Sequence, residues 1–140
     1  MKKTLCASLV ALTLVACAST NVSTADAPEI PNDHVIDKSL TNVSAGTLPV
    51  TFKRDTFGPA HALYRVKVFV DGRAVANIGS GEKLTTHLPA GRHVFGVGRS
   101  NSSVPEREIA VTVSEQYQPV LRLSLVADGW GGWKITESSF

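Results

Sequence analysis

Residues 64–97, YRVKVFVDGRAVANIGSGEKLTTHLPAGRHVFGV, contain four short apolar runs separated by breaks rich in Gly, Pro or Asp. In the first run Val66, Val68 and Val70 alternate with Lys67 and Phe69. Successive side chains of a strand point to opposite faces, so this alternation predicts a half-buried β-strand. The later runs, residues 74–78, 84–88 and 93–97, have strand-like lengths too, and the stretch therefore predicts four strands joined by turns.

Asp71 and Gly72 form the first of these breaks. A two-residue hairpin turn needs positive φ, which Gly adopts without steric cost, so Asp-Gly between apolar runs predicts a tight β-hairpin. Gly79-Ser80-Gly81 and Pro89-Ala90-Gly91 mark the next two turns.

The same alternation recurs on both sides of the central stretch. It predicts further strands over residues 49–54, 109–113, 120–126 and 133–135, which makes seven or eight in total. Strands this short and evenly spaced, without long helical periodicity between them, predict an all-β fold, a small antiparallel β-sandwich, instead of βαβ units.

The motifs V-x-V-D-G, G-E-K and L-P-A-G-x-H-x-x-x-V, read from residues 68–97, resemble the repeat of PEGA-type domains. The chain is more similar still to small bacterial lipoproteins with a domain of the DUF2846 type, whose aromatic-x-Arg opening strand resembles Phe52-Lys53-Arg54. The resemblance covers about residues 50–98 and implies a prealbumin-like or immunoglobulin-like sandwich. That family has no known catalytic residues, so the resemblance implies none here.

The N-terminus has the pattern of a bacterial lipoprotein signal. Lys2 and Lys3 precede an apolar run over residues 4–15, which is too short to span a bilayer as a helix. The run ends in Leu14-Val15-Ala16-Cys17, which fits the lipobox. We therefore expect residues 1–16 to be a signal peptide and Cys17 to receive the acyl chains that its resemblance to lipoproteins implies. The alternative is an ordinary secretory signal in which Cys17 stands by chance.

Residues 17–46 are rich in Ser, Thr, Asn and Ala, a composition that predicts a lipidated Cys followed by a flexible linker. As a coil this linker spans roughly 30 Å and lifts the domain, residues 47–140, clear of the head groups. Alternatively, part of it forms a short amphipathic helix or a docked strand, through Val35, Ile36, Leu40 and Val43. Residue 18 is Ala, not Asp, which by resemblance to enterobacterial lipoproteins favours the outer membrane, with the domain facing the periplasm.

Charge and cysteine content exclude some classes of function. Without Lys2 and Lys3, the count of Lys plus Arg falls from 14 to 12 and equals the 12 Asp plus Glu. A neutral domain has no basic stripe with which to neutralise phosphates, so nucleic acid is not an expected partner. Cys6 lies in the signal peptide and Cys17 is the expected acylation site, so no disulfide is expected.

The chemistry-bearing residues do not form a convincing catalytic or metal-binding motif. His61, His87 and His93 lack the short spacing that marks a zinc site, and Ser80 is not in a nucleophile elbow. We therefore expect no cofactor, no bound metal and no enzymatic activity. Trp130 and Trp133 are the candidates for contact with a sugar or peptide, and the alternative is that both rings cap the end of the sandwich.

These observations leave three functions in order of preference. The first is a membrane-anchored envelope lipoprotein whose sandwich is a non-catalytic interaction or structural module, with an envelope protein as partner. The second is a module that binds a small ligand or a glycan such as peptidoglycan, through Trp130 and the polar loop over residues 99–105. The third is an envelope enzyme.

Overall fold

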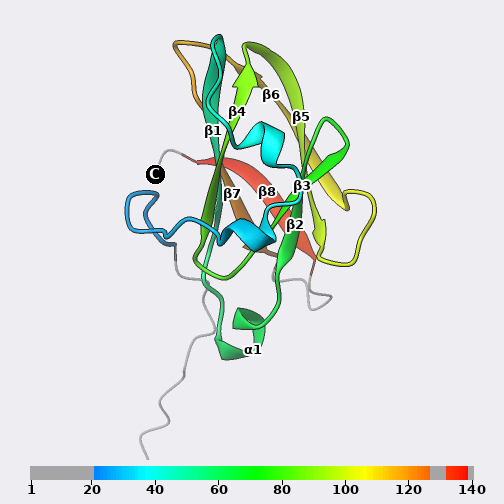
Figure 1. The fold of residues 1–140 in the computed structure, drawn as a ribbon. Coiled ribbons are helices and arrows are strands. Elements are labelled where there is room, and N and C mark those ends of the chain that lie inside the picture. Colours follow the sequence, from blue (N-terminus) through cyan, green and yellow to red (C-terminus); the bar gives the residue numbers. More distant parts are fainter. Residues whose placement is uncertain (1–20, 127–131, 139–140) are drawn as a thin grey trace, which may run out of the picture.

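The protein is an eight-stranded β-sandwich, which confirms the predicted all-β fold (Figure 1). The computed structural model describes residues 21–126 and 132–138. Its strands are β1 (Thr47–Arg54), β2 (Val66–Val70), β3 (Arg73–Ile78), β4 (Lys83–Pro89), β5 (Gly91–Arg99), β6 (Arg107–Val113), β7 (Val120–Leu125) and β8 (Trp133–Ser138). Three helical turns accompany them: η1 (Asn32–His34), η2 (Lys38–Leu40) and α1 (Pro59–Ala62).

The strands form two four-stranded sheets with the orders β4-β1-β7-β8 and β3-β2-β5-β6. Neighbouring strands run antiparallel except β1 and β7, which pair in parallel from Thr51↔Val120 to Arg54↔Leu123. The parallel pair arises because β6 ends at the same end of the sandwich where β1 begins. Residues 114–119 then carry the chain across to the other sheet, so that β7 starts beside β1 and runs in the same direction.

The core lies between the two sheets and consists of the inward-facing residues that the alternation predicts. Phe52 of β1 and Phe95 of β5 meet edge to face across the sandwich, with their ring centroids 5.7 Å apart. Aliphatic side chains from all eight strands surround this pair, and those fully removed from solvent are Val50, Val66, Val68, Val75, Ala76, Ile78, Val97, Leu121 and Leu123. Burial of this apolar surface is the main stabilising term for the fold.

The Asp71-Gly72 hairpin is present as predicted. Both residues have positive φ, 49° and 78°, and they connect β2 directly to β3. The turn lies at the end of the sandwich away from α1, which we call the opposite end. The other end, the α1 end, carries α1 and the connections over residues 55–65, 79–82 and 100–106 (Figure 1).

Residues 21–46, expected to belong to a flexible linker, lie against the sandwich, and we call them the N-terminal strap. Ile30 is 7% exposed and belongs to the core, and Val35 and Leu40 pack on it. The strap pairs in parallel with β4 at Glu29↔Lys83 and antiparallel with β3 at Val35↔Ala76. Of the four residues named for the docked alternative, Val35 and Leu40 pack against the core, whereas Ile36 and Val43 are 50% and 78% exposed.

The strap covers two strand edges at once. Strands β3 and β4 are edge strands of different sheets, and their backbones contribute hydrogen bonds to the strap, including Ile30 N to Lys83 O (2.9 Å) and Ile36 N to Val75 O (2.7 Å). Unpaired edges invite association with other strands, so the strap protects this side of the sandwich.

One residue of the central stretch is buried on an unexpected face. Phe69, expected on the polar face of β2 with Lys67, is buried, although it is not part of the inner core. The connection over residues 100–106 folds back over β5, so that a Cβ added at Gly96 would lie 2.6 Å from Pro105 Cβ and 3.3 Å from Phe69 Cβ. This connection therefore covers Phe69 from outside.

Candidate binding site

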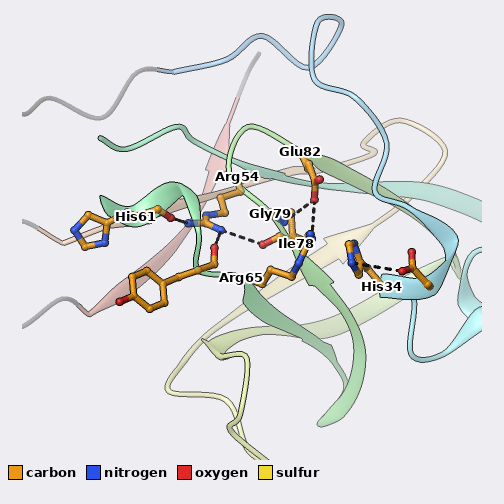
Figure 2. Close-up of polar contacts among 9 residues, drawn as sticks. His34, Arg54, His61, Arg65, Ile78, Gly79 and Glu82 are labelled. Carbon is orange, nitrogen blue, oxygen red and sulfur yellow. Dashed lines mark hydrogen bonds and ion pairs between the residues drawn. The ribbon is translucent and has the colours of Figure 1, made fainter. Parts of the chain in front are cut away.

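The α1 end is organised by the buried guanidinium of Arg54, the last residue of β1 (Figure 2). Arg54 follows Val50 and Phe52 on the inward face, so its side chain enters the space between the sheets. Its Nη1 donates to the carbonyl oxygens of Tyr64 and Ile78 (3.1 Å to Ile78), and its Nη2 donates to the His61 carbonyl oxygen at 2.9 Å. Arg54 therefore holds the backbone on both sides of Leu63 and ties it to the end of β3.

Among the described residues, the contacts of Arg54 are with backbone carbonyl oxygens and an aromatic ring, and none is an ion pair with a carboxylate. Its Cζ lies 4.7 Å from the centroid of the Trp133 ring, a cation–π geometry. Burial lowers the pKa of Arg54 to about 10, while the nearby charge of Glu82 raises it and that of Arg65 lowers it. The side chain therefore stays protonated at neutral pH and serves as a structural cation under the surface of the α1 end.

Glu82 links this buried cation to the surface. Its Oε2 accepts from the backbone N–H of Gly79 at 2.7 Å and from Arg65 Nη1 at 3.4 Å (Figure 2). The carboxylate therefore closes the turn between β3 and β4 and orients Arg65, whose side chain is partly exposed.

A hollow of about 560 Å³ opens above this layer, between α1 and the loop that follows β5. Three kinds of side chain line it: aromatic and aliphatic groups, groups with basic nitrogens, and small polar groups. They are Tyr64, Trp133 and Leu125; Arg65, Arg99 and His61; and Ser100 and Asn101. Apolar walls with a few convergent polar groups are typical of a ligand site.

The cationic rim of the hollow is held in place by neighbouring groups. Arg99 Nε lies 3.3 Å from Glu106 Oε1, and Lys67 Nζ donates to the Ser102 carbonyl oxygen at 2.7 Å. The loop that carries Arg99 and Asn101 is thus fixed to β2 and to the start of β6. Among the described residues that line the hollow there is no carboxylate, so its lining favours an anionic or neutral polar ligand.

Only some of the residues proposed from the sequence line this hollow. Trp133 lies at the hollow, buried against Arg54, and the loop over residues 99–105 contributes three of the lining residues. Trp130 and Cys17 lie outside the described residues. The sequence predicts Arg54 as the end of the strand over residues 49–54 and indicates no role for it at a site. A charged residue that follows alternating apolar positions usually indicates where a strand ends.

The three histidines of the considered zinc triad lie in separate surroundings. His61 contacts Phe57 at the α1 end, whereas His93 bonds Asp71 and the Pro89 carbonyl oxygen at the opposite end. His87 lies in β4, at a second hollow beneath the strap. Within residues 21–126 and 132–138, no three His, Cys, Asp or Glu side chains are grouped to hold a metal ion.

Comparisons of this chain with protein-family models, with curated proteins and with solved structures find no match. The resemblance to PEGA-type and DUF2846-type domains therefore stays a prediction from the quoted motifs. The part of the chain that the structure describes contains no helix long and apolar enough to cross a membrane.

Proposed function

We propose that the protein is an envelope lipoprotein, anchored in the outer membrane by acyl chains on Cys17, whose β-sandwich is a non-catalytic interaction module facing the periplasm. The lipobox over residues 14–17 supports the anchor. The hollow at the α1 end is the observation that carries the interaction role, because it combines a concave aromatic surface with an oriented cationic rim.

A glycan or a small anionic ligand is the second candidate for the occupant of the hollow. Tyr64, which is 64% exposed, supplies an aromatic ring on which a sugar ring packs, and Asn101 supplies an amide, whereas Trp133 lines the hollow but is itself buried against Arg54. Arg65 and Arg99 suit a carboxylate, because a guanidinium presents a planar fork of donors to it. Peptidoglycan carries both sugar rings and carboxylates.

One experiment in intact cells tests the anchor and the contact surface together. Wild-type protein should incorporate labelled palmitate, and Cys17→Ser should remain an unlabelled precursor. A photocrosslinking residue is then placed at Asn101 in the hollow or, as the matched control, at Arg92. Both positions are exposed. Arg92 lies near the start of β5 and Asn101 lies just beyond its end, so the two positions report opposite ends of the sandwich.

We expect an adduct from position 101 and none from position 92. Loss of the adduct on protease treatment identifies a protein partner, and loss on muramidase treatment identifies a glycan. Equal labelling at both positions, or none at position 101, contradicts the hollow as the contact site. Palmitate on Cys17→Ser, or none on the wild type, contradicts the anchor.

A further inference from the structure

The N-terminal strap leaves very little chain between Cys17 and the sandwich. The Asn21 side-chain oxygen accepts from Lys53 Nζ at 3.2 Å, and Lys83 Nζ donates to the Thr24 carbonyl oxygen at 2.8 Å. Lys53 stands next to Arg54 near the end of β1, and Lys83 begins β4. The start of the strap is therefore fixed beside the α1 end of the sandwich.

The length of chain before Asn21 limits the position of the anchor. Four residue steps separate Cys17 from Asn21. Even fully extended, four steps cover only about 14 Å. Acyl chains on Cys17 are thus attached within that distance of the point where Lys53 holds the strap, in place of the roughly 30 Å of a free linker. This step rests on the proposed anchor.

The α1 end exposes apolar side chains on its outer surface. Leu63 is 88% exposed and Tyr64 is 64% exposed, and both belong to the segment between α1 and β2 that projects below the sheets (Figure 1). Arg54 holds the carbonyl oxygens of His61 and Tyr64, so the backbone that carries Leu63 is fixed. Such a pair suits a membrane interface, because Leu can insert among the acyl chains while the Tyr ring, with its polar tip, sits at head-group level.

Charge complements this apolar tip. Arg65 and Arg99, both at the hollow with Tyr64, are partly exposed, with side-chain exposures of 37% and 67%, although each also forms an ion pair, Arg65 with Glu82 and Arg99 with Glu106. Basic groups next to inserted apolar side chains strengthen binding to anionic phospholipids.

We propose that the segment formed by α1 and residues 63–64 docks on the phospholipid leaflet that holds the acyl chains of Cys17. The sandwich then stands on the membrane with its α1 end down, and the Asp71-Gly72 hairpin points away from the surface. The occupant of this apolar tip is thus a lipid bilayer containing anionic phospholipid.

The experiment uses the processed, acylated chain that begins at Cys17, in vesicles of phosphatidylethanolamine and phosphatidylglycerol. Cys6 lies in the signal peptide and Cys17 is acylated, so an introduced Cys is the only free thiol for an environment-sensitive fluorophore. Leu63→Cys reports the α1 end. Val43→Cys is the matched control, because Val43 is an apolar residue with 78% exposure that precedes β1 at the opposite end. A lipid with a nitroxide on its head group quenches fluorophores that reach the membrane.

We expect a blue shift and loss of most of the fluorescence at position 63, with neither change at position 43. Equal quenching at the two positions, stronger quenching at position 43, or none at either overturns the orientation. Mass measurement of the same preparation separates the two proposals. A chain without acyl groups on Cys17 overturns the anchor and the orientation together, whereas an acylated chain with equal quenching overturns the orientation alone. Equal unfolding midpoints of the two variants show that both are folded.

Discussion

At the scale of single residues, Gly72 determines the first hairpin through its backbone conformation. Its φ is +78°, and a Cβ at this position would meet nothing within 4 Å. The requirement is therefore conformational and not one of space, because side chains with a branched Cβ rarely adopt positive φ.

We expect Gly72→Val to lower the free energy of unfolding by about 1–3 kcal/mol, the scale of one forced backbone conformation. Gly72→Asn is the matched control, since Asn tolerates this region, and it should lose much less. Chemical denaturation measures both. Equal midpoints for the Val and Asn variants would contradict the conformational argument.

His93 and Asp71 join two turns of the opposite end. His93 Nδ1 lies 2.8 Å from Asp71 Oδ2, and Nε2 lies 3.0 Å from the Pro89 carbonyl oxygen. Burial alone would lower the pKa of His93, but the hydrogen bonds to Asp71 and Pro89 and the Asp71 charge raise it above 6.5. Burial raises the pKa of Asp71, but its bonds from His93 and Val94 bring it below 3.8.

These shifts predict how stability depends on pH. The His93 contribution is complete below pH 6.5 and is lost as the pH rises through the raised pKa of the folded state, while the Asp71 contribution is present above pH 3.8 and is lost as the pH falls through the lowered pKa. The free energy of unfolding should therefore decrease above about pH 6.5 by up to about 1 kcal/mol, the scale of a partly exposed ion pair. His93→Gln and Asp71→Asn should each abolish this decrease. A decrease that persists in both variants would contradict the assignment.

At the scale of elements, the N-terminal strap contributes Ile30 to the core cluster of the sandwich. Ile30 is 7% exposed, whereas Ile36, six residues later on the same strap, is 50% exposed. The two residues have the same chemistry and differ in burial.

Ile30→Ala should lower the free energy of unfolding by about 2–5 kcal/mol, because it leaves a cavity in addition to losing buried surface. Ile36→Ala should change it by about 0.5 kcal/mol or less. The comparison uses denaturation of the full chain. If the two variants unfold at the same denaturant concentration, the strap does not pack as described, and a free linker over residues 21–46 becomes the better description.

The elements also show how far the sequence reveals the fold. The eight strands agree with the seven or eight predicted, some from alternation, because a half-buried strand imposes a period of two on its side chains, and others from strand-like length between turn residues. Docking of the strap was not the preferred prediction, because its packed residues Ile30, Val35 and Leu40 follow neither a helical nor a strand period. Its burial depends on two edges that come together only in the folded sandwich. Phe69 shows the same limit, since the loop that covers it comes from residues far along the chain.

At the scale of the whole molecule, the candidate site was predictable only in part. The polar loop over residues 99–105 and Trp133 were proposed from composition, and both line the hollow. The structural role of Arg54 was not predictable, because its partners are backbone carbonyl oxygens of His61, Tyr64 and Ile78, which any residue type supplies. The proposed orientation on the membrane also places the hollow near the head groups, which favours a partner in or close to that layer.

The strap has a mechanical consequence for an anchored protein. A pull on the anchor first loads the bond between Lys53 and Asn21 and then the contacts of Lys83 with Thr24 and Ile30, one after another along the chain. Bonds loaded in sequence break singly, so the strap peels away at lower force than a strand sheared out of a sheet. Once peeled, residues 21–46 supply about 90 Å of extended chain. In a chain anchored as proposed, a pull on Cys17 would therefore lengthen the tether by releasing the strap before it loads the strands of the two sheets.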